Sequence, residues 1–268
     1  MNPVDPARAR GFDEWAGEYD QFRPGYPEEL FDTIAARLPL PRQPHVVDLG
    51  AGTGRASLAM AAYGWRVTAV EPGRPMLDLL RGNASNEGLL VSTLQASAEA
   101  TGLDPASADL VTAAQSFHWF DKPAALTEMA RILKPGGGVA LFWNVRDRER
   151  SPFLADYEEL LSRSINDRDA GRYEWEGPDA TRRAIEAHGA AFEDPQLIQL
   201  RQEVPMTDEQ FVGMAFTASY VRVGRSPEEL DRFRLALAGL LGRHGLNDGR
   251  PFPVPYRIDL WITRRSDR

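Results

Sequence analysis

The stretch Val46-Val47-Asp48-Leu49-Gly50-Ala51-Gly52-Thr53-Gly54 decides the fold of this chain. A short apolar run, separated from the preceding helical segment by Pro39-Leu40-Pro41, enters a turn with glycine at alternate positions. Glycine adopts positive φ angles and carries no side chain, so such a turn is tight and brings bare backbone against a ligand. The next segment, Arg55 to Tyr63, has its apolar residues at helical spacing. The stretch therefore predicts a strand, a ligand-binding turn and a helix.

Glu71 is the second feature of the predicted site. It follows the strand expected over Arg66 to Val70, where a carboxylate can accept hydrogen bonds from both hydroxyls of a ribose. The dinucleotide fingerprint would place a small residue at Arg55 or Ser57, so the glycine spacing argues against a nicotinamide dehydrogenase. A tight turn without a ligand would explain the glycines alone, but not their combination with Asp48 and Glu71.

A regular alternation of strands and helices continues beyond this unit. We expect helices from Glu28 to Leu38, from Pro75 to Asn83 and from Pro123 to Leu133. The expected strands are His45–Leu49, Arg66–Val70, Leu90–Gln95, Ala108–Ala114 and Val139–Trp143. Such alternation is typical of βαβ units in a parallel sheet, whose ligand site lies at the carboxyl ends of the strands.

After Asn144 the pattern changes, and we interpret the second half as completing the sheet while inserting helices over the cleft. Helices are expected over Pro152–Ser164, Gly177–His188, Asp208–Tyr220 and Pro227–Arg243, and strands over Leu197–Glu203 and Tyr256–Thr263. Three parts follow: N-terminal helices covering cofactor and substrate (1–41), a cofactor-binding Rossmann-like core (42–145), and the rest of the sheet with a helical substrate cap (146–268).

Composition and charge exclude several classes of function. The formal net charge of −8 disfavours binding to nucleic acid or to an anionic membrane. The absence of cysteine excludes disulfides, thiolate metal sites and cysteine nucleophiles. His45, His188 and His244 lack metal-ligand spacing, so we expect no metal. No apolar run reaches the roughly 18 residues of a membrane span, and we expect a cytoplasmic protein.

The stretch Val46–Gly54 and Glu71 resemble motif I and the acidic residue that follows it in class I S-adenosylmethionine-dependent methyltransferases. The resemblance extends through Leu94 to Glu99, similar to the third-strand motif around adenine, and through Arg131 to Gly138, similar to the turn before strand five. It implies an α/β, Rossmann-like fold with a mostly parallel seven-stranded sheet, S-adenosyl-L-methionine as cofactor and S-adenosyl-L-homocysteine as product. Position 97 is Ser where many members carry Asp, which leaves the backbone N–H of Ala98 to hold adenine.

Two further segments, Gln115 to Asp121 and Arg23 to Pro27, are similar to the type 11 methyltransferase domains of the small-molecule branch that includes the trans-aconitate type. That branch methylates a carboxylate, which implies a small-molecule acceptor. The resemblance also implies that Tyr19 or Arg23 closes over the methionine end of the cofactor, and an Arg can hold its carboxylate. The cofactor-binding residues expected in all are Tyr19, Arg23, Asp48, Gly50, Ala51, Gly52, Thr53, Gly54, Glu71, Pro72, Ser97, Ala98 and Gln115.

His118 is the candidate catalytic residue, because it lies just past the fourth strand. It could be a general base for a hydroxyl acceptor, a positioning donor for a carboxylate, or a histidine that only packs locally. The acceptor pocket is expected to include Tyr26, Trp119, Trp143, Asn144 and Tyr220. The resemblance implies methyl transfer to an oxygen of a small molecule, and we expect it to be metal-free. Methylation at nitrogen or carbon, and a non-catalytic cofactor-binding protein, remain as alternatives.

Overall fold

The computed structural model describes residues 16–164, 178–222 and 224–266. In this part of the chain seven strands form one sheet in the order β3-β2-β1-β4-β5-β7-β6. All neighbouring strands are parallel except β7, which runs antiparallel to β5 and β6. The expected mostly parallel, Rossmann-like sheet is confirmed. The strands are β1 (His45–Leu49), β2 (Arg66–Val70), β3 (Val91–Leu94), β4 (Ala108–Ala114), β5 (Leu133–Arg146), β6 (Gln196–Met206) and β7 (Phe252–Arg264).

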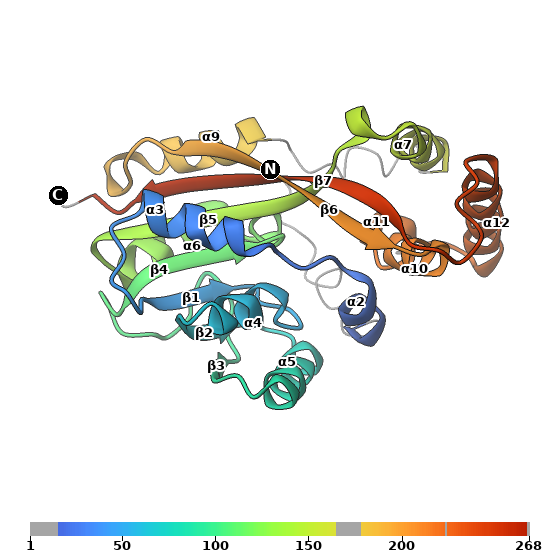
Figure 1. Cartoon of the computed structure of the whole chain (residues 1–268). Helices are drawn as coiled ribbons and strands as arrows, with labels where there is room; N and C mark the ends of the chain where they lie inside the picture. The colour runs from blue at the N-terminus through green and yellow to red at the C-terminus, as the bar shows by residue number, and fades with distance from the viewer. Residues whose placement is uncertain (1–15, 165–177, 223, 267–268) are drawn as a thin grey trace.

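Helices cover both faces of the sheet (Figure 1). They are α2 (Ala16–Phe22), α3 (Glu28–Arg37), α4 (Arg55–Ala62), α5 (Arg74–Glu87), α6 (Lys122–Ile132), α7 (Pro152–Ser164), α9 (Pro178–Ala187), α10 (Asp208–Phe216), α11 (Ser219–Arg222) and α12 (Pro227–Arg243). Short 3₁₀ turns η2 (Phe117–Trp119), η3 (Arg148–Arg150) and η4 (Gly189–Ala191) lie between them. None of the described helices is long and apolar enough to cross a membrane.

Two apolar clusters hold the helices against the sheet. On one face, α6 and α9 pack on the strands through Leu126, Met129 and Ile185. On the other face, α3 and α4 do so through side chains such as Phe31 and Met60. Because side chains alternate along a strand, β5 contributes to both clusters. This sandwich fixes the carboxyl ends of β1, β2, β4 and β5 along one edge.

A third apolar cluster joins α7, α10, α11 and α12 to the extended ends of β6 and β7. Figure 1 shows these helices gathered at one end of the molecule, with the two long strands reaching into them. The helices of this end are thus anchored to the sheet by a core of their own.

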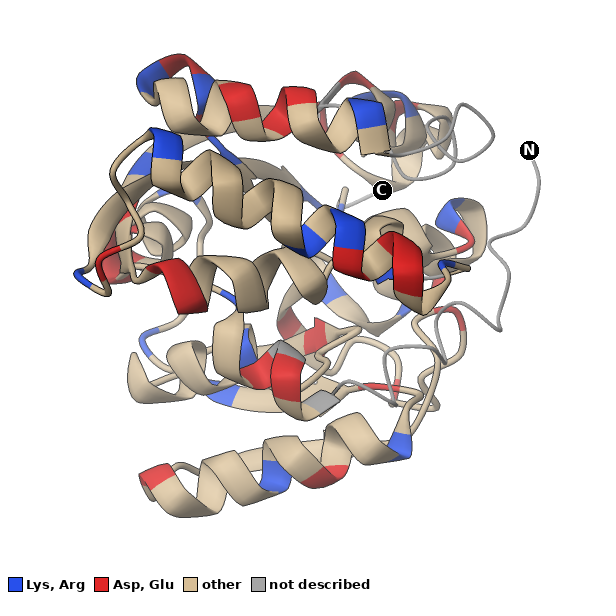
Figure 2. Cartoon of the chain, turned by 90° about the vertical axis from the view of Figure 1, so that its right-hand side faces the viewer, with Lys and Arg blue, Asp and Glu red and all other residues tan. Residues whose placement is uncertain are grey.

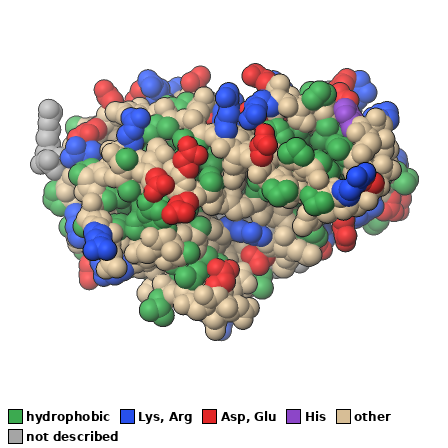
Figure 3. Space-filling view, in the orientation of Figure 1, with side chains coloured by type: hydrophobic (Ala, Val, Ile, Leu, Met, Phe, Trp, Pro, Cys, Tyr) green, Lys and Arg blue, Asp and Glu red, His purple; other side chains and the backbone are tan. Residues whose placement is uncertain are grey.

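Figure 2 views this end directly, and Figure 3 views the molecule from the side of Figure 1. Acidic and basic residues are interspersed along the helices drawn in Figure 2 and over the surface drawn in Figure 3.

The structure differs from the sequence-based expectation most clearly at two elements, while α5 continues to Glu87 instead of about Asn83 and β7 begins at Phe252 instead of Tyr256. The helix expected over Asp208–Tyr220 is divided into α10 and α11, because the Thr217 hydroxyl donates to the Met214 carbonyl oxygen (2.7 Å) and Arg23 binds the Thr217 carbonyl oxygen (3.1 Å). The strand β5 begins at Leu133 rather than near Val139. Leu133 pairs with Ala108 across an irregular register, so the predicted Pro-Gly turn lies within the strand.

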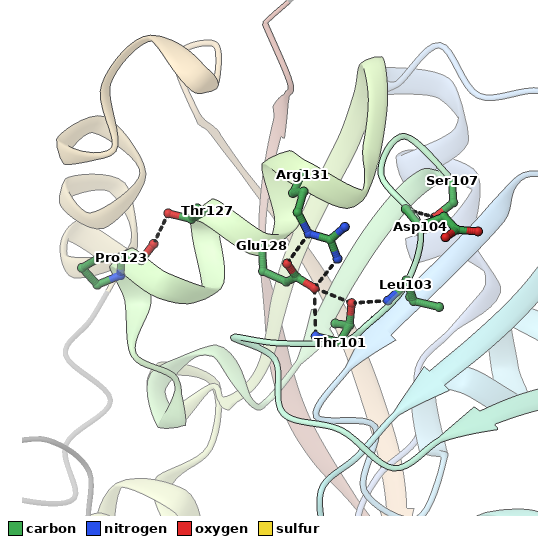
Figure 4. Close-up of polar contacts among 8 residues, drawn as sticks. All are labelled: Thr101, Leu103, Asp104, Ser107, Pro123, Thr127, Glu128 and Arg131. Carbon is green, nitrogen blue, oxygen red and sulfur yellow. Dashed lines mark hydrogen bonds and ion pairs between the residues drawn. The ribbon is translucent and has the colours of Figure 1, made fainter.

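A buried carboxylate fixes the loop between β3 and β4 against α6 (Figure 4). Glu128 accepts hydrogen bonds from the backbone N–H and the hydroxyl of Thr101 (2.8 and 2.5 Å) and from the Arg131 guanidinium (2.7 and 2.8 Å). The hydrogen bond from Arg131 is the largest cause that lowers the pKa of Glu128 to about 2, and the Thr101 bonds lower it further while burial opposes them. This interaction ties the loop after β3 to α6.

Candidate cofactor and acceptor site

The glycine-rich turn joins β1 to α4 in a conformation that requires its glycines. The φ angles of Gly50, Gly52 and Gly54 are +65°, +56° and +93°, values that L side chains rarely adopt. A Cβ atom at Gly50 would lie 2.7 Å from the Cβ of Ser116, and one at Gly54 would lie 2.6 Å from the Cγ of Leu80. At Gly52, by contrast, no heavy atom of the described residues lies within 4 Å of that position. Among the described residues, the space beside the Cα of Gly52 is therefore open.

Glu71 connects this turn to the end of β2. Its Oε2 accepts a hydrogen bond from the N–H of Gly52 (2.9 Å), and its Oε1 accepts one from the N–H of Gly73 (2.9 Å). The N–H groups of Gly50 and Ala51 donate to the Val70 carbonyl oxygen (2.8 and 3.1 Å). Each carboxylate oxygen has more than one lone pair, so Glu71 can hold the turn and still accept from ribose hydroxyls. Gly52 and Glu71, predicted separately, lie in direct contact.

Asp48 joins the elements on which the glycine-rich turn rests. Its side chain is completely buried, and its carboxylate accepts hydrogen bonds from the Ser57 hydroxyl (2.5 Å) and the Thr112 hydroxyl (2.8 Å). Burial raises the pKa of Asp48 to about 6, although both hydrogen bonds act in the opposite direction. The carboxylate thus ties α4 and β4 to the end of β1. Asp48 therefore helps to fix the conformation of the turn.

Thr53 provides a test of whether this turn fits a cofactor. Its side chain is 1% exposed, and within the described residues its hydroxyl oxygen has no hydrogen-bond partner. A buried hydroxyl without a partner is uncommon in native proteins, and an unfilled ligand position is one explanation for it. Together with the open space at Gly52, this hydroxyl fits a bound nucleoside group at the turn.

The residues expected around adenine lie at the carboxyl ends of β2 and β3. Gln95 donates from its side chain to the carbonyl oxygen of Pro72 (3.1 Å), which fixes the segment after Glu71. Ser97 is half-buried and forms an isolated bridge with Ala100, while the side chain of Ala98 is buried. The structure brings this segment to the same edge of the sheet as the glycine-rich turn.

The segment after β4 packs against the glycine-rich turn, where the Ser116 side chain lies beside Gly50. Gln115 has a φ of +55°, which is unusual for a residue other than glycine, and its side chain donates to the carbonyl oxygen of Asn144 (3.2 Å). The Ser116 hydroxyl donates to the Leu49 carbonyl oxygen (2.8 Å). Strain of this kind concentrates at functional sites. The segment is thus fixed to β1 on one side and to β5 on the other.

His118 lies in η2 and is oriented by Trp143. The indole Nε1–H of Trp143 donates to Nδ1 of His118 (3.3 Å). An indole N–H can only donate, so Nδ1 must present a lone pair. The neutral ring then carries its proton on Nε2. The Trp119 ring lies 4.9 Å from the His118 ring, centroid to centroid, so three of the expected residues form one aromatic group.

The N-terminal helix α2 connects the core with the helices at the far end. The guanidinium of Arg23, just after α2, donates to the Thr217 hydroxyl (2.9 Å) as well as to the Thr217 carbonyl oxygen. In α2 itself, Asp20 accepts a hydrogen bond from Asn83 of α5 (2.9 Å). Tyr19 also belongs to α2, but its side chain lies outside the described residues. Of the two residues expected over the methionine end, Arg23 thus binds Thr217, the residue that follows α10.

Tyr26 and Asn144 lie together on one face of β5. The ring of Tyr26 makes an edge contact with Phe142, with centroids 4.9 Å apart. The Asn144 amide donates to the Gly25 carbonyl oxygen (3.2 Å) and accepts from Gln202 (2.9 Å). Tyr220, from α11, lies further along, where its hydroxyl accepts from Arg146 (3.1 Å). The expected acceptor residues thus occur on both faces of β5, since Trp143 lies on the other.

Sequence reasoning missed several polar residues that organise these positions. Ser57 and Thr112, which bind Asp48, sit within a helix and a strand that look merely structural in sequence. Gln202 and Arg146 come from elements outside the motifs. A signal was present only for Arg146, a charged residue three positions after the apolar run Val139–Trp143.

Comparison with known proteins gives the family of the core. Residues 47–141 match the methyltransferase domain family. An uncharacterized methyltransferase of Mycobacterium tuberculosis is 40% identical over 152 residues, 57% of this chain and 59% of that protein. One from Schizosaccharomyces pombe is 33% identical over 155 residues, 58% of this chain and 60% of that protein. The matched segments thus cover less than two thirds of these relatives.

Solved structures match over more of the chain. A candidate type II methyltransferase from Anaeromyxobacter dehalogenans superimposes with a TM-score of 0.61 at 27% identity, covering 92% of this chain and 100% of that chain. Phosphoethanolamine N-methyltransferase 2 of Haemonchus contortus, in complex with S-adenosyl-L-methionine, gives a TM-score of 0.57 at 16% identity, covering 96% of this chain and 60% of that chain. At that identity the second likeness shows the fold alone.

Proposed function

We propose that this chain, which carries a methyltransferase domain of the class I S-adenosylmethionine-dependent type, transfers a methyl group from S-adenosyl-L-methionine to an oxygen of a small molecule. The observation that carries the proposal is the contact between Glu71 and the N–H of Gly52, where the space beside the Gly52 Cα is open among the described residues. Carboxylate, bare backbone and the buried Thr53 hydroxyl then meet at one edge of the sheet, where a nucleoside would bind.

Bound at this turn, S-adenosyl-L-methionine would supply an electrophilic methyl group on a sulfonium. Glu71 would bind the ribose hydroxyls, and the backbone at Ala98 would bind adenine beside Ser97 and Pro72. The chain's own contribution to the rate would be chiefly to hold the acceptor in line and close. The rigid segment from Gln115 to Trp119, fixed to both β1 and β5, suits that task.

His118 is proposed as a positioning donor. Its Nδ1 accepts from Trp143, so the neutral ring carries the proton on Nε2. In that form Nε2 can donate a hydrogen bond to an acceptor oxygen but has no lone pair with which to remove a proton. This supports an acceptor that is already ionised, such as a carboxylate. A hydroxyl or a carbon acceptor would instead need a base elsewhere to take its proton, and an amine would have to bind in its neutral form.

We further propose that the helices at the far end act as a substrate cap and that α2 covers the cofactor. Arg23, just after α2, binds Thr217 at the end of α10, and Asp20 of α2 binds Asn83 of α5. The division into a covering segment (1–41), a core (42–145) and a capped remainder (146–268) is part of this proposal. So is a cytoplasmic location, which rests on the sequence alone.

Turnover tests the function. The purified chain would be incubated with S-adenosyl-L-methionine and a panel of small carboxylic acids, alcohols and amines, and S-adenosyl-L-homocysteine would be quantified by mass spectrometry. Acceptor-dependent product with a carboxylic acid is the expected result. Product with amines alone would contradict oxygen transfer. Tight cofactor binding with no turnover on any acceptor would favour the non-catalytic alternative.

A further inference from the structure

A group of hydrogen-bond donors lies at the end of β5, apart from the glycine-rich turn. Arg146 and Tyr256 are partners in the antiparallel register of β5 and β7, so their side chains leave the same face of the sheet as neighbours. Helix α7 adds Tyr157 and α11 adds Tyr220, and all three tyrosines belong to the apolar cluster of the far end. A guanidinium and three phenol groups thus lie together beside this apolar cluster.

The guanidinium of Arg146 is held in place by hydrogen bonds from two of its three nitrogens. Its Nε donates to Glu158 (3.0 Å), and its Nη2 donates to the Tyr220 hydroxyl (3.1 Å) and lies 2.9 Å from Glu158. Its Cζ lies 5.1 Å from the centre of the Tyr157 ring. Nη1 donates no hydrogen bond to any residue that the structure describes. Its two N–H groups can therefore donate to an acceptor outside these residues.

Two buried tyrosine hydroxyls also lack a hydrogen-bond partner among the described residues. Tyr157 is 0% exposed and Tyr256 is 3% exposed, and neither hydroxyl has a hydrogen-bond partner in the described parts of the chain. Burial raises the pKa of both phenols above the usual range, while the charge of Arg146 opposes the rise at each and that of Arg23 opposes it at Tyr256. The hydroxyls stay protonated and act as donors. Buried donors without partners destabilise a fold unless something fills their position.

The chemistry of this group defines what would satisfy it. Nη1 and the hydroxyls of Tyr157, Tyr220 and Tyr256 all offer protons, whereas Glu158, the nearby acceptor, is already bound to Arg146. A ligand rich in acceptors and carrying negative charge matches such a set, because charge-assisted hydrogen bonds are the stronger ones. A single water molecule could accept only two of these protons.

We propose that Arg146, Tyr157, Tyr220 and Tyr256 form a binding site for an anionic oxygen group, a carboxylate or a phosphate, on the small-molecule acceptor. The identity of the ligand as methyl acceptor rests on the proposed function, but the anion site does not. Arg146 lies two residues beyond Asn144 on β5, so this site and the segment after β4 are at the same edge of the sheet. The acceptor would be held by its anionic group at one end, with its reacting atom nearer the cofactor.

Probes with and without charge test this site. Malonate, inorganic phosphate and the neutral malonamide would be titrated into wild-type protein by calorimetry, in the presence and in the absence of S-adenosyl-L-homocysteine. We expect malonate or phosphate to bind and to raise the melting temperature, and malonamide to do neither. Binding of malonate alone would identify a carboxylate, and binding of phosphate alone a phosphorylated acceptor.

The matched variants remove hydroxyls without changing shape. The double variant Tyr157→Phe/Tyr256→Phe should fold with an unchanged or higher melting temperature, since it deletes unpartnered groups, and should bind the anion at least about tenfold more weakly. Tyr63→Phe, whose hydroxyl binds the exposed Asp32 instead, should bind as wild type. If the double variant does not fold, Tyr220→Phe at the half-buried position serves the same comparison.

Two results would overturn the proposal. One is that no anionic probe binds, and the other is that the Tyr→Phe variants bind the anion as tightly as wild type does. Neither depends on methyl transfer. Anion binding without any cofactor binding would contradict the proposed function and leave the site standing, whereas methyl transfer with no anion binding would do the reverse.

Discussion

Replacing Gly52 by alanine separates ligand approach from folding. Its φ of +56° disfavours an L side chain, which costs on the order of 1–2 kcal/mol of folding free energy. No described heavy atom lies within 4 Å of the added Cβ, so no clash adds to that cost. The N–H that Glu71 binds is retained in the variant. The stability loss should therefore be modest and the turn should stay in place.

Cofactor affinity should respond much more strongly. If the cofactor packs against the bare backbone at Gly52, the new methyl group occupies its space, and overpacking of this kind costs roughly 1–3 kcal/mol. That corresponds to an affinity about 5- to 150-fold weaker. The matched control is Gly88→Ala, at the end of α5, where φ is +66° and no described heavy atom lies within 4 Å of the added Cβ.

Urea unfolding and calorimetric titration with S-adenosyl-L-homocysteine measure the two effects. Gly52→Ala and Gly88→Ala should lose similar stability, and only Gly52→Ala should lose affinity. Equal affinity in both variants and the wild type would refute the assignment of Gly52 to the cofactor site. An equal loss in both would show that the effect is one of stability.

The remaining predictions concern protonation and hydrogen bonding. His118→Gln should retain appreciable turnover with an already ionised acceptor, and its rate should be nearly constant from about pH 6 to 8. A turnover rate about a thousandfold lower in the variant, together with a fall of the rate at acidic pH that only the wild type shows, would identify His118 as a base. Glu128, whose folded pKa of about 2 lies below its unfolded value, stabilises the fold above about pH 4.5 by up to ~3 kcal/mol, which is lost as the pH falls toward 2. Glu128→Gln should be less stable than the wild type at pH 7, and its free energy of unfolding, measured with urea, should not show this loss at low pH. The same pH dependence of the free energy of unfolding in variant and wild type would exclude a stabilising role of the Glu128 carboxylate. Asp48, with its pKa raised to about 6 by burial, should make the wild type lose up to ~3 kcal/mol as the pH rises from about 4 to 6, a loss that Asp48→Asn should abolish.

The core and the cofactor loop could be predicted from sequence because their signals are local. The strand, the alternating glycines and the helix after them lie within residues 45–63, and Glu71 follows one element later. Parallel βαβ units then bring these positions together by topology alone. The contact between Glu71 and the N–H of Gly52 follows from that arrangement.

The far end of the molecule could not be predicted in the same way. The split between α10 and α11 depends on Arg23, which lies 194 residues from Thr217 in sequence. The pairing of Arg146 with Tyr256 depends on the antiparallel register of β5 and β7, and a one-residue slip would place those side chains on opposite faces. Tyr157 reads in sequence as one more apolar position of an amphipathic helix. Only the structure reveals that its buried hydroxyl has no described partner.

The central claim is that Glu71 and the glycine-rich turn hold S-adenosyl-L-methionine. Calorimetric titration of the cofactor into wild-type protein and into Glu71→Ala, with folding of the variant checked by circular dichroism, tests it most directly. The carboxylate offers hydrogen bonds worth roughly 1.5–3 kcal/mol to a ligand. We predict one-to-one binding to the wild type and an affinity about 10- to 150-fold weaker in the variant. Equal affinity in the folded variant, or no binding to the wild type, would contradict the account.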